Sequence, residues 1–165
     1  MTIHRFVAHR AQLFALALAM VAAVTRPAPA QARFGAQLGL STDEYGIGLG
    51  IREWIPTAGR IAVIASANCV FRALRDNELD LNIDAAYRFS PQRAAVQPYL
   101  GGGLGLTHYP VTYQATAYAL NLFGGTRFGQ QAKAGPFLEL RLIIAAGSSH
   151  VGPASRLTTT IGLLF

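Results

Sequence analysis

The sequence predicts an all-β protein, an eight-stranded antiparallel transmembrane β-barrel that follows a cleaved signal peptide. Three observations lead to this prediction. The chain opens with an export-type segment and closes with a strand-like segment that ends on Phe165. It is 52% hydrophobic and only 13% charged, whereas about a quarter of the residues of a soluble domain are charged. Beyond its first residues it offers no long apolar helix, and a chain this apolar then crosses a membrane only as a closed barrel.

Residues 1–32 are predicted to be the signal peptide and residues 33–165 the barrel domain. Two arginines precede an apolar run from Leu13 to Val24. This run is shorter than the roughly 20 residues that a membrane-spanning helix needs. Two prolines end it, and the small residues of Ala30-Gln31-Ala32 form a cleavage site. We therefore expect the mature chain to begin near Arg33.

Charge and cysteine content exclude several classes of protein. Removing the three arginines of residues 1–32 from the 14 basic residues leaves 11 against 8 acidic ones, so the net charge falls from +6 to +3. A charge this small does not indicate a nucleic-acid partner. Cys69 is the only cysteine, so no intramolecular disulfide is expected, and it is predicted to pack as a small apolar residue.

The remainder of the chain divides into eight segments in which apolar residues alternate with polar or small ones. They are residues 34–41, 45–52, 60–70, 78–89, 96–107, 116–128, 137–144 and 157–165. The alternation is clearest in the first, second and fourth, as where Leu79, Leu81 and Ile83 alternate with Asp80 and Asn82. A period of two is typical of a strand with two different faces and excludes an amphipathic helix. Each segment is close to the roughly 9–11 residues of a tilted transmembrane strand, and an even number of strands fits a closed antiparallel barrel.

The other five segments carry the same pattern less regularly. The third is the weakest, because Ile64 and Val70 share a face with Ser66 and Asn68. The last four place an apolar row opposite a small, polar or charged one: Leu100, Leu104 and Leu106 opposite Gly101, Gly103 and Gly105; Tyr118, Leu120, Leu122 and Phe128 opposite Asn121, Phe123 and Arg127; Leu138, Leu140, Leu142 and Ile144 opposite Phe137, Glu139, Arg141 and Ile143; and Leu157, Ile161, Leu163 and Phe165 opposite Arg156, Thr158, Thr160 and Gly162.

Composition indicates which face points outward. A face in water would need Lys and Glu throughout, but the more polar face here is largely Gly, Ser, Thr and Asn. The interior of an eight-stranded barrel is just wide enough for side chains, and glycine rows such as Gly101, Gly103 and Gly105 suit so narrow a lumen. The same run could be taken for a phosphate-binding loop. It lacks the following helix and the Lys-Ser/Thr pair that such a loop requires, so we set that interpretation aside.

With these features the chain resembles the small outer-membrane β-barrel proteins of Gram-negative bacteria, the OmpA/OmpX-like and opacity-like families. The resemblance lies in the signal segment, the Pro98–Gly105 and Phe137–Arg141 strands, and the Phe165 ending. It implies a monomer in the outer membrane, exported through the inner membrane, in contact with outer-membrane lipid and lipopolysaccharide. It also implies handling by periplasmic chaperones and by the barrel-assembly machinery, which would recognise a C-terminal signal made by Ile161, Leu163 and Phe165. In one departure from the OmpA layout, we expect no periplasmic peptidoglycan-binding domain after the barrel.

If both chain ends are periplasmic, the aromatic residues are expected to form a girdle at each membrane surface. The periplasmic girdle would consist of Phe34, Trp54, Phe89, Phe128 and Phe165, and the outer one of Tyr45, Phe71, Tyr109, Tyr113 and Tyr118. The outer loops are short for this class of barrel.

The inward-facing charges are the main chemical feature of the chain. We predict a lumen network made by Arg52, Asp84, Arg88, Arg127, Glu139 and Arg141, in which the four arginines pair with the two acids across the barrel. Leaving such charges unpaired would cost several kcal/mol each. The network is expected to fill the lumen and fix the register of the strands. The alternative is a gate in a narrow pore.

We expect no enzyme activity, no cofactor and no bound metal. The strongest catalytic candidates are Ser148, Ser149 and His150 in the last outer loop, with His108 at the outer end of the fifth segment. A Ser–His pair needs a carboxylate to orient the histidine, and no acid is near His150 in the sequence. The His-x-Ser-Asn pattern of the lipid A deacylases is also absent.

The sequence thus predicts an outer-membrane barrel with a structural or interaction role and a filled lumen. One alternative is a narrow solute pore, which larger conductance in Arg141→Ala would support. A second is a lipid A-modifying outer-membrane enzyme, which a mass shift of lipid A lost in His150→Ala would support. A third is a soluble calyx for a lipophilic ligand, which would make the protein periplasmic and independent of detergent.

Overall fold

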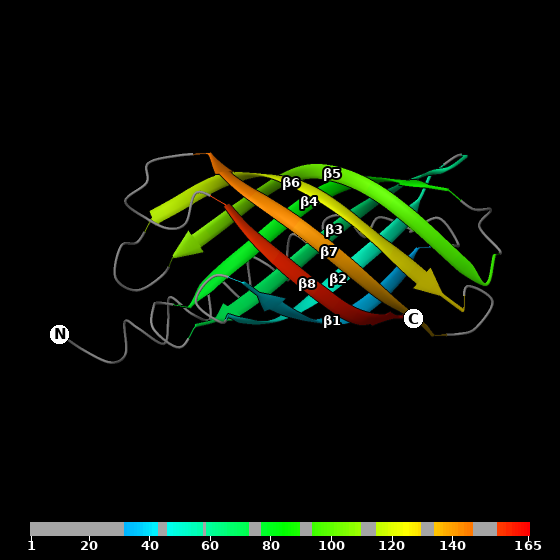
Figure 1. The fold of residues 1–165 in the computed structure, drawn as a ribbon, viewed down its shortest axis with the longest axis horizontal. Coiled ribbons are helices and arrows are strands. Elements are labelled where there is room, and N and C mark those ends of the chain that lie inside the picture. The colour runs from blue at the N-terminus through cyan, green and yellow to red at the C-terminus, as the bar shows by residue number, and fades with distance from the viewer. Residues whose placement is uncertain are drawn as a thin grey trace.

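The computed structural model describes residues 32–42, 46–57, 59–72, 77–89, 94–109, 115–129, 134–146 and 155–165. These residues form eight strands: β1 (Arg33–Ser41), β2 (Ile47–Pro56), β3 (Ile61–Phe71), β4 (Glu78–Arg88), β5 (Val96–Tyr109), β6 (Ala115–Phe128), β7 (Gly135–Ala146) and β8 (Ser155–Leu164). Each strand pairs antiparallel with the next, and β1 pairs antiparallel with β8, so the sheet closes into a barrel (Figure 1). The predicted fold class is confirmed. The predicted signal peptide lies outside the described residues, apart from Ala32.

The register of the strands defines two ends of the barrel. At one end, which we call the terminal end, Arg33 pairs with Trp54 and Gly35 pairs with Leu164. At the opposite end, Ser41 pairs with Thr158. The first strand therefore begins and the last strand finishes at the same end, as the expected topology requires. The carboxyl end of the chain marks the terminal end in Figure 1.

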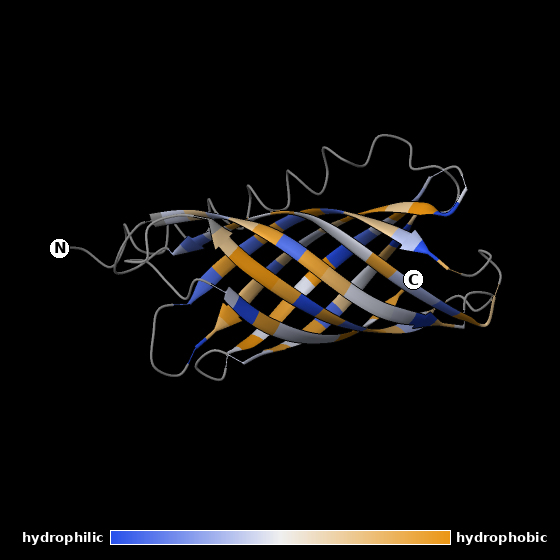
Figure 2. Ribbon diagram, turned by 45° about the horizontal axis from the view of Figure 1, so that its top comes forward, coloured by the Kyte–Doolittle hydropathy of each residue, from blue (hydrophilic) through white to orange (hydrophobic). Residues whose placement is uncertain are grey.

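The outward face of the barrel is largely apolar. Large hydrophobic side chains stand exposed on every strand, among them Leu104 at 67% and Ile83 at 63% of their full area. Figure 2 shows the result as an alternation of apolar and polar residues along the strands. Soluble monomers rarely expose apolar patches beyond a few hundred Å², so this surface is suited to lipid. In the described part of the chain, no helix is long and apolar enough to cross a membrane.

The inward face is divided between polar residues and an apolar cluster nearer the terminal end. This cluster consists of Trp54, Ala62, Ile64, Ala86, Tyr99, Phe123, Phe137 and Leu164. Two of its aromatic members lie nearer the terminal end than a polar neighbour on the same strand, Trp54 relative to Arg52 and Phe137 relative to Glu139. The lumen of the barrel is therefore a packed core rather than an open channel.

The prediction of the aromatic girdles is wrong for two residues. Trp54 is fully buried in the lumen cluster, and Tyr109 lines a small pocket with Thr107. β2 does not end at Arg52 but runs on to Pro56. Because Trp54 is two residues after Arg52 on the same strand, its side chain points into the lumen as that of Arg52 does. The sequence pattern did not reveal this extension, because Glu53 interrupts the outward apolar row. Tyr45 and Tyr113 lie outside the described residues.

Three glycines make room for the lumen aromatics. In the register, Gly101 lies opposite Phe123, Gly125 opposite Tyr99, and Gly162 opposite Phe137. A Cβ atom on any of these glycines would collide with the facing ring or its hydroxyl group. Each ring thus covers the bare backbone of the neighbouring strand, a known way of compensating for glycine in sheets. Within the glycine row of the sequence, Gly101 faces an aromatic ring, whereas Gly103 and Gly105 face Asp84 and Asn82 of the polar network.

Candidate functional site

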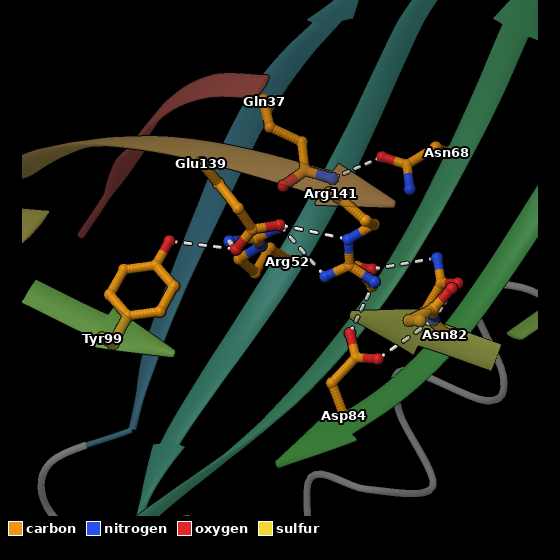
Figure 3. A network of polar contacts seen from close by, with 10 residues as sticks. Gln37, Arg52, Asn68, Asn82, Asp84, Tyr99, Glu139 and Arg141 are labelled. Atoms are coloured by element: carbon orange, nitrogen blue, oxygen red, sulfur yellow. Dashed lines mark hydrogen bonds and ion pairs between the residues drawn. The ribbon is translucent and has the colours of Figure 1, made fainter. Parts of the chain in front are cut away.

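Glu139 on β7 is the centre of the polar network in the lumen. Its two carboxylate oxygens accept hydrogen bonds from the two terminal nitrogens of Arg52, each at 2.8 Å. Oε1 also accepts hydrogen bonds from Arg141, at 3.1 and 3.0 Å, and Oε2 accepts one from the Tyr99 hydroxyl at 2.9 Å. The Glu139 side chain has no exposed area. Five hydrogen bonds therefore satisfy one fully buried carboxylate, from β2, β5 and β7 (Figure 3).

Asp84 on β4 extends this network to the other side of the lumen. Its Oδ2 atom forms an ion pair with Nη1 of Arg141 at 2.8 Å, and its Oδ1 atom accepts a hydrogen bond from Asn121 at 3.0 Å. The Asn121 amide also donates to Asn82 at 2.9 Å, and Asn82 donates to Ser66 at 3.3 Å. Arg141 therefore bridges the two acids (Figure 3). We call the four charged residues Arg52, Asp84, Glu139 and Arg141 the central network. The network links strands on opposite sides of the barrel.

The guanidinium groups of this network also lie over aromatic rings. The Arg52 guanidinium is 4.5 Å from the centre of the Phe137 ring, and that of Arg141 is 4.6 Å from the centre of the Phe123 ring. A cation over a ring face is attracted to it and loses freedom to move. The apolar cluster therefore holds the arginines in place from the terminal side, while the carboxylates bind them.

A second ionic cluster lies at the opposite end of the lumen. Glu78 accepts a hydrogen bond from Arg72 at 2.9 Å and another from Arg156. Arg156 also donates to Asp80 at 2.5 Å, and Thr107 donates to the other oxygen of Asp80 at 2.6 Å. Alternation with Leu79 and Leu81 puts Glu78 and Asp80 on the same face, but the sequence analysis did not identify Arg72 and Arg156 as partners of these two acids. Arg156 shares its face with Thr158 and Thr160, so the alternation contained the signal.

Arg88 and Arg127 do not pair with the acids as the sequence predicted. Arg88 donates to the backbone carbonyl oxygens of Gly59 and Ile61, at 2.5 and 3.2 Å. Arg127 donates to the side chain of Gln97 at 3.4 Å, and its guanidinium lies 4.3 Å from the centre of the Trp54 ring. Neither arginine contacts an acid among the described residues.

The reason for this difference is the position of these two arginines along the barrel. Arg88 is the last residue of β4 and Arg127 the last inward residue of β6, so both lie at the terminal end. Asp84 is four residues away from Arg88, or about 13 Å along a strand, and Arg141 already bridges it to Glu139. Of the six predicted network residues, the structure thus brings four together, namely Arg52, Asp84, Glu139 and Arg141, and places two elsewhere.

The space left in the lumen is small. A cavity beside the central network is lined by polar side chains that include Gln37, Asn68, Arg141 and Arg156, and the volume open to the centres of water molecules is about 30 Å³. Gln37 donates a hydrogen bond to Asn68 across it. Since one water needs roughly 10–15 Å³ measured in this way, the cavity accommodates two or three water molecules. It has no room for a larger solute.

The catalytic candidates are only partly described. Ser148, Ser149 and His150 lie outside the described residues. His108 Nδ1 lies 3.0 Å from the Thr116 hydroxyl, and it shares the outward face with Leu104 and Leu106. Among the residues that the structure describes, no group of three His, Cys, Asp or Glu side chains is arranged to hold a metal ion. Cys69 is a half-buried free thiol on β3.

The side chains of the predicted assembly signal all face outward. Ile161, Leu163 and Phe165 are exposed by 56, 46 and 60%. Phe165 is fixed at the terminal end by a hydrogen bond from its backbone nitrogen to the carbonyl oxygen of Phe34, at 2.6 Å. The apolar row is therefore available on the surface of the folded barrel, and its recognition by an assembly machinery stays a prediction.

Comparison with solved structures identifies the fold. The chain is similar to the N-terminal β-barrel domain of Pseudomonas aeruginosa OprF, with a TM-score of 0.61, 13% identity, and coverage of 81% of this chain and 95% of that one. It is similar to the Neisserial surface protein A, with a TM-score of 0.62, 13% identity, and coverage of 81% and 94%. It is also similar to the outer membrane enzyme PagL, with a TM-score of 0.54, 13% identity, and coverage of 81% and 98%.

No protein-family model matches the sequence, and no curated protein matches it. Because identities of 13% carry no site from one protein to another, these likenesses describe the architecture alone. The chain has the fold of the small eight-stranded outer-membrane β-barrels.

Proposed function

We propose that the protein is a monomeric outer-membrane β-barrel whose lumen is closed and whose role is structural or one of interaction. The observation that carries this proposal is the filling of the lumen. Two ionic clusters and one aromatic cluster follow one another along the barrel, and each is buried. A barrel of eight strands has an interior just wide enough for side chains. It is a rigid support that presents its outer surface and loops rather than a path for solutes.

The outward apolar surface and the nature of the similar structures support a location in the outer membrane. Those structures are the N-terminal β-barrel domain of OprF, the Neisserial surface protein A and the outer membrane enzyme PagL. In that location the partners are lipid and lipopolysaccharide, with periplasmic chaperones and the assembly machinery during biogenesis. The proposal includes no nucleic acid, cofactor or enzyme activity. The likeness to PagL is one of fold, and fold alone does not supply a catalytic site.

The first test is cell fractionation of the full-length chain, followed by gel electrophoresis with and without boiling. We expect the protein in the outer-membrane fraction, with a mobility that changes on boiling, because a closed barrel resists detergent until it is heated. A soluble periplasmic protein without this shift would contradict the membrane location. It would favour the soluble calyx instead.

The second test is conductance in planar bilayers. We expect no resolved single-channel steps from the wild-type protein or from Arg141→Ala. Removing Arg141 opens the central network but leaves the layer of Trp54, Tyr99, Phe123 and Phe137 across the lumen. Trp54→Ala combined with Arg141→Ala, checked for folding by its heat-dependent mobility, is the matched variant that breaks both layers. A conductance that rises in Arg141→Ala alone would support the narrow pore and overturn the closed lumen.

A further inference from the structure

The three charged layers of the lumen differ in their balance of charge. The cluster at the opposite end contains two acids and two arginines, and the central network contains the same. The layer at the terminal end has Arg33, Arg88 and Arg127. The one buried acid at this end among the described residues, Glu53, alternates with the inward-facing Arg52 and Trp54 and so belongs to the outward face. By sequence, the connections at this end, residues 57–60, 89–95 and 129–134, contain no Asp or Glu.

Two of these arginines are buried and have unused donors. Arg88 and Arg127 are exposed by only 1 and 4%. In Arg88, Nε and Nη1 have no hydrogen-bond partner, and in Arg127 the same holds for Nε. Their existing contacts are backbone carbonyls, the amide oxygen of Gln97 and the Trp54 ring. All of these are neutral, so neither charge is compensated by a contact.

The electrostatic surroundings of Arg127 add to this imbalance. Arg33, Arg88 and Arg52 all act on it with charges of the same sign. Burying a guanidinium without a counter-charge is costly, and gathering several of them increases the cost. A negatively charged group at this position would offset both the cost of burying these charges and the repulsion between them.

We propose that the terminal end of the lumen is an oxyanion-binding site that takes a phosphate group, with Arg88 and Arg127 as its ligands and Arg33 as a source of further positive charge. The planar fork of arginine matches the spacing of phosphate oxygens. The two ligands are also held in advance, Arg88 by two carbonyl oxygens and Arg127 by the Trp54 ring. The phosphate would come either from solution or from a lipid headgroup at the membrane surface. This site is additional to the proposed role and does not depend on whether the lumen conducts.

Trp54 gives a direct readout, because it is the only tryptophan and contacts Arg127. The full-length protein in neutral detergent is titrated with potassium phosphate, and with potassium chloride at equal ionic strength. We expect a saturable change in Trp54 fluorescence with phosphate only, which sulfate competes away. A hydrogen bond to a charged group accounts for roughly a tenfold change in affinity or more. Arg88→Gln and Arg127→Gln should therefore raise the dissociation constant by at least that factor.

Arg60→Gln is the matched control, since Arg60 is at the same end but exposed and bonded to the Tyr87 hydroxyl. It should bind phosphate as the wild type does. Heat-dependent mobility verifies that each variant is folded, and sulfate competition in the wild type tests the site without any variant.

In bilayer discs, a change with phosphatidylglycerol but not with free phosphate assigns a lipid headgroup, and the reverse assigns free phosphate. No saturable response to either free phosphate or phosphatidylglycerol, or an unchanged affinity in folded Arg88→Gln and Arg127→Gln, would overturn the proposal.

Discussion

Glu139→Gln is expected to lower the free energy of unfolding by about 3–5 kcal/mol, the usual cost of removing one partner of a buried ion pair. The fully buried carboxylate of Glu139 accepts hydrogen bonds from Arg52, Arg141 and Tyr99. Glutamine keeps the shape but removes the charge. Arg141 would still have Asp84 as a partner, whereas Arg52 would lose its only carboxylate contact among the described residues. The cost therefore comes mainly from Arg52, left charged inside the barrel.

Urea unfolding in detergent, followed by the fluorescence of Trp54, measures this change. Glu53→Gln is the matched control, because Glu53 lies on the outward face of β2 and its carboxylate has no hydrogen-bond partner in the described part of the chain. Removing that charge breaks no contact, so the stability should stay the same or rise. Equal losses in the two variants would show that the effect of Glu139→Gln is not due to the network.

Gly103→Ala is expected to destabilise the barrel by at least about 1–3 kcal/mol, the usual range for overpacking a filled interior. Gly103 on β5 faces Asp84 in the register. A Cβ atom on it would lie closer than 3.0 Å to the backbone carbonyl oxygen of Ile83 and to two atoms of Asp84. The carbonyl cannot move without breaking strand pairing, and Asp84 cannot move without releasing Arg141. A single methyl group should therefore disturb both the backbone and the central network.

Gly48→Ala provides the comparison, because the nearest atom to a Cβ on Gly48 is a Val70 methyl group at 3.6 Å, an ordinary contact. Alanine also restricts the unfolded chain more than glycine does, so this variant should be as stable as the wild type or slightly more so. The temperature at which the heat-dependent mobility shift occurs ranks the two variants. If Gly103→Ala shifts at the wild-type temperature, the tight packing at Gly103 is not a constraint on this barrel.

The sequence alone predicted the barrel because its main signal is local. Alternation along one strand, as in Leu79–Arg88, needs no knowledge of any other strand, since side chains of a strand point to opposite faces in turn. The same local rule correctly assigned Glu139, Arg141 and Asp84 to the lumen. The rule failed where a polar residue stands on the outward face. Because Glu53 breaks the apolar row of β2, the sequence did not show that this strand continues to Pro56 or that Trp54 points inward.

The pairing of the charges could not be predicted in this way, because it depends on how far along the barrel each residue lies. The sequence determined which side chains enter the lumen, and it did so through a period of two. Only the tertiary structure decided their partners, since the register of all eight strands sets their height in the barrel. It placed Arg52 and Arg141 level with Glu139, gave Arg156 to Glu78 and Asp80, and left Arg88 and Arg127 at the terminal end beyond the reach of any acid in the described lumen.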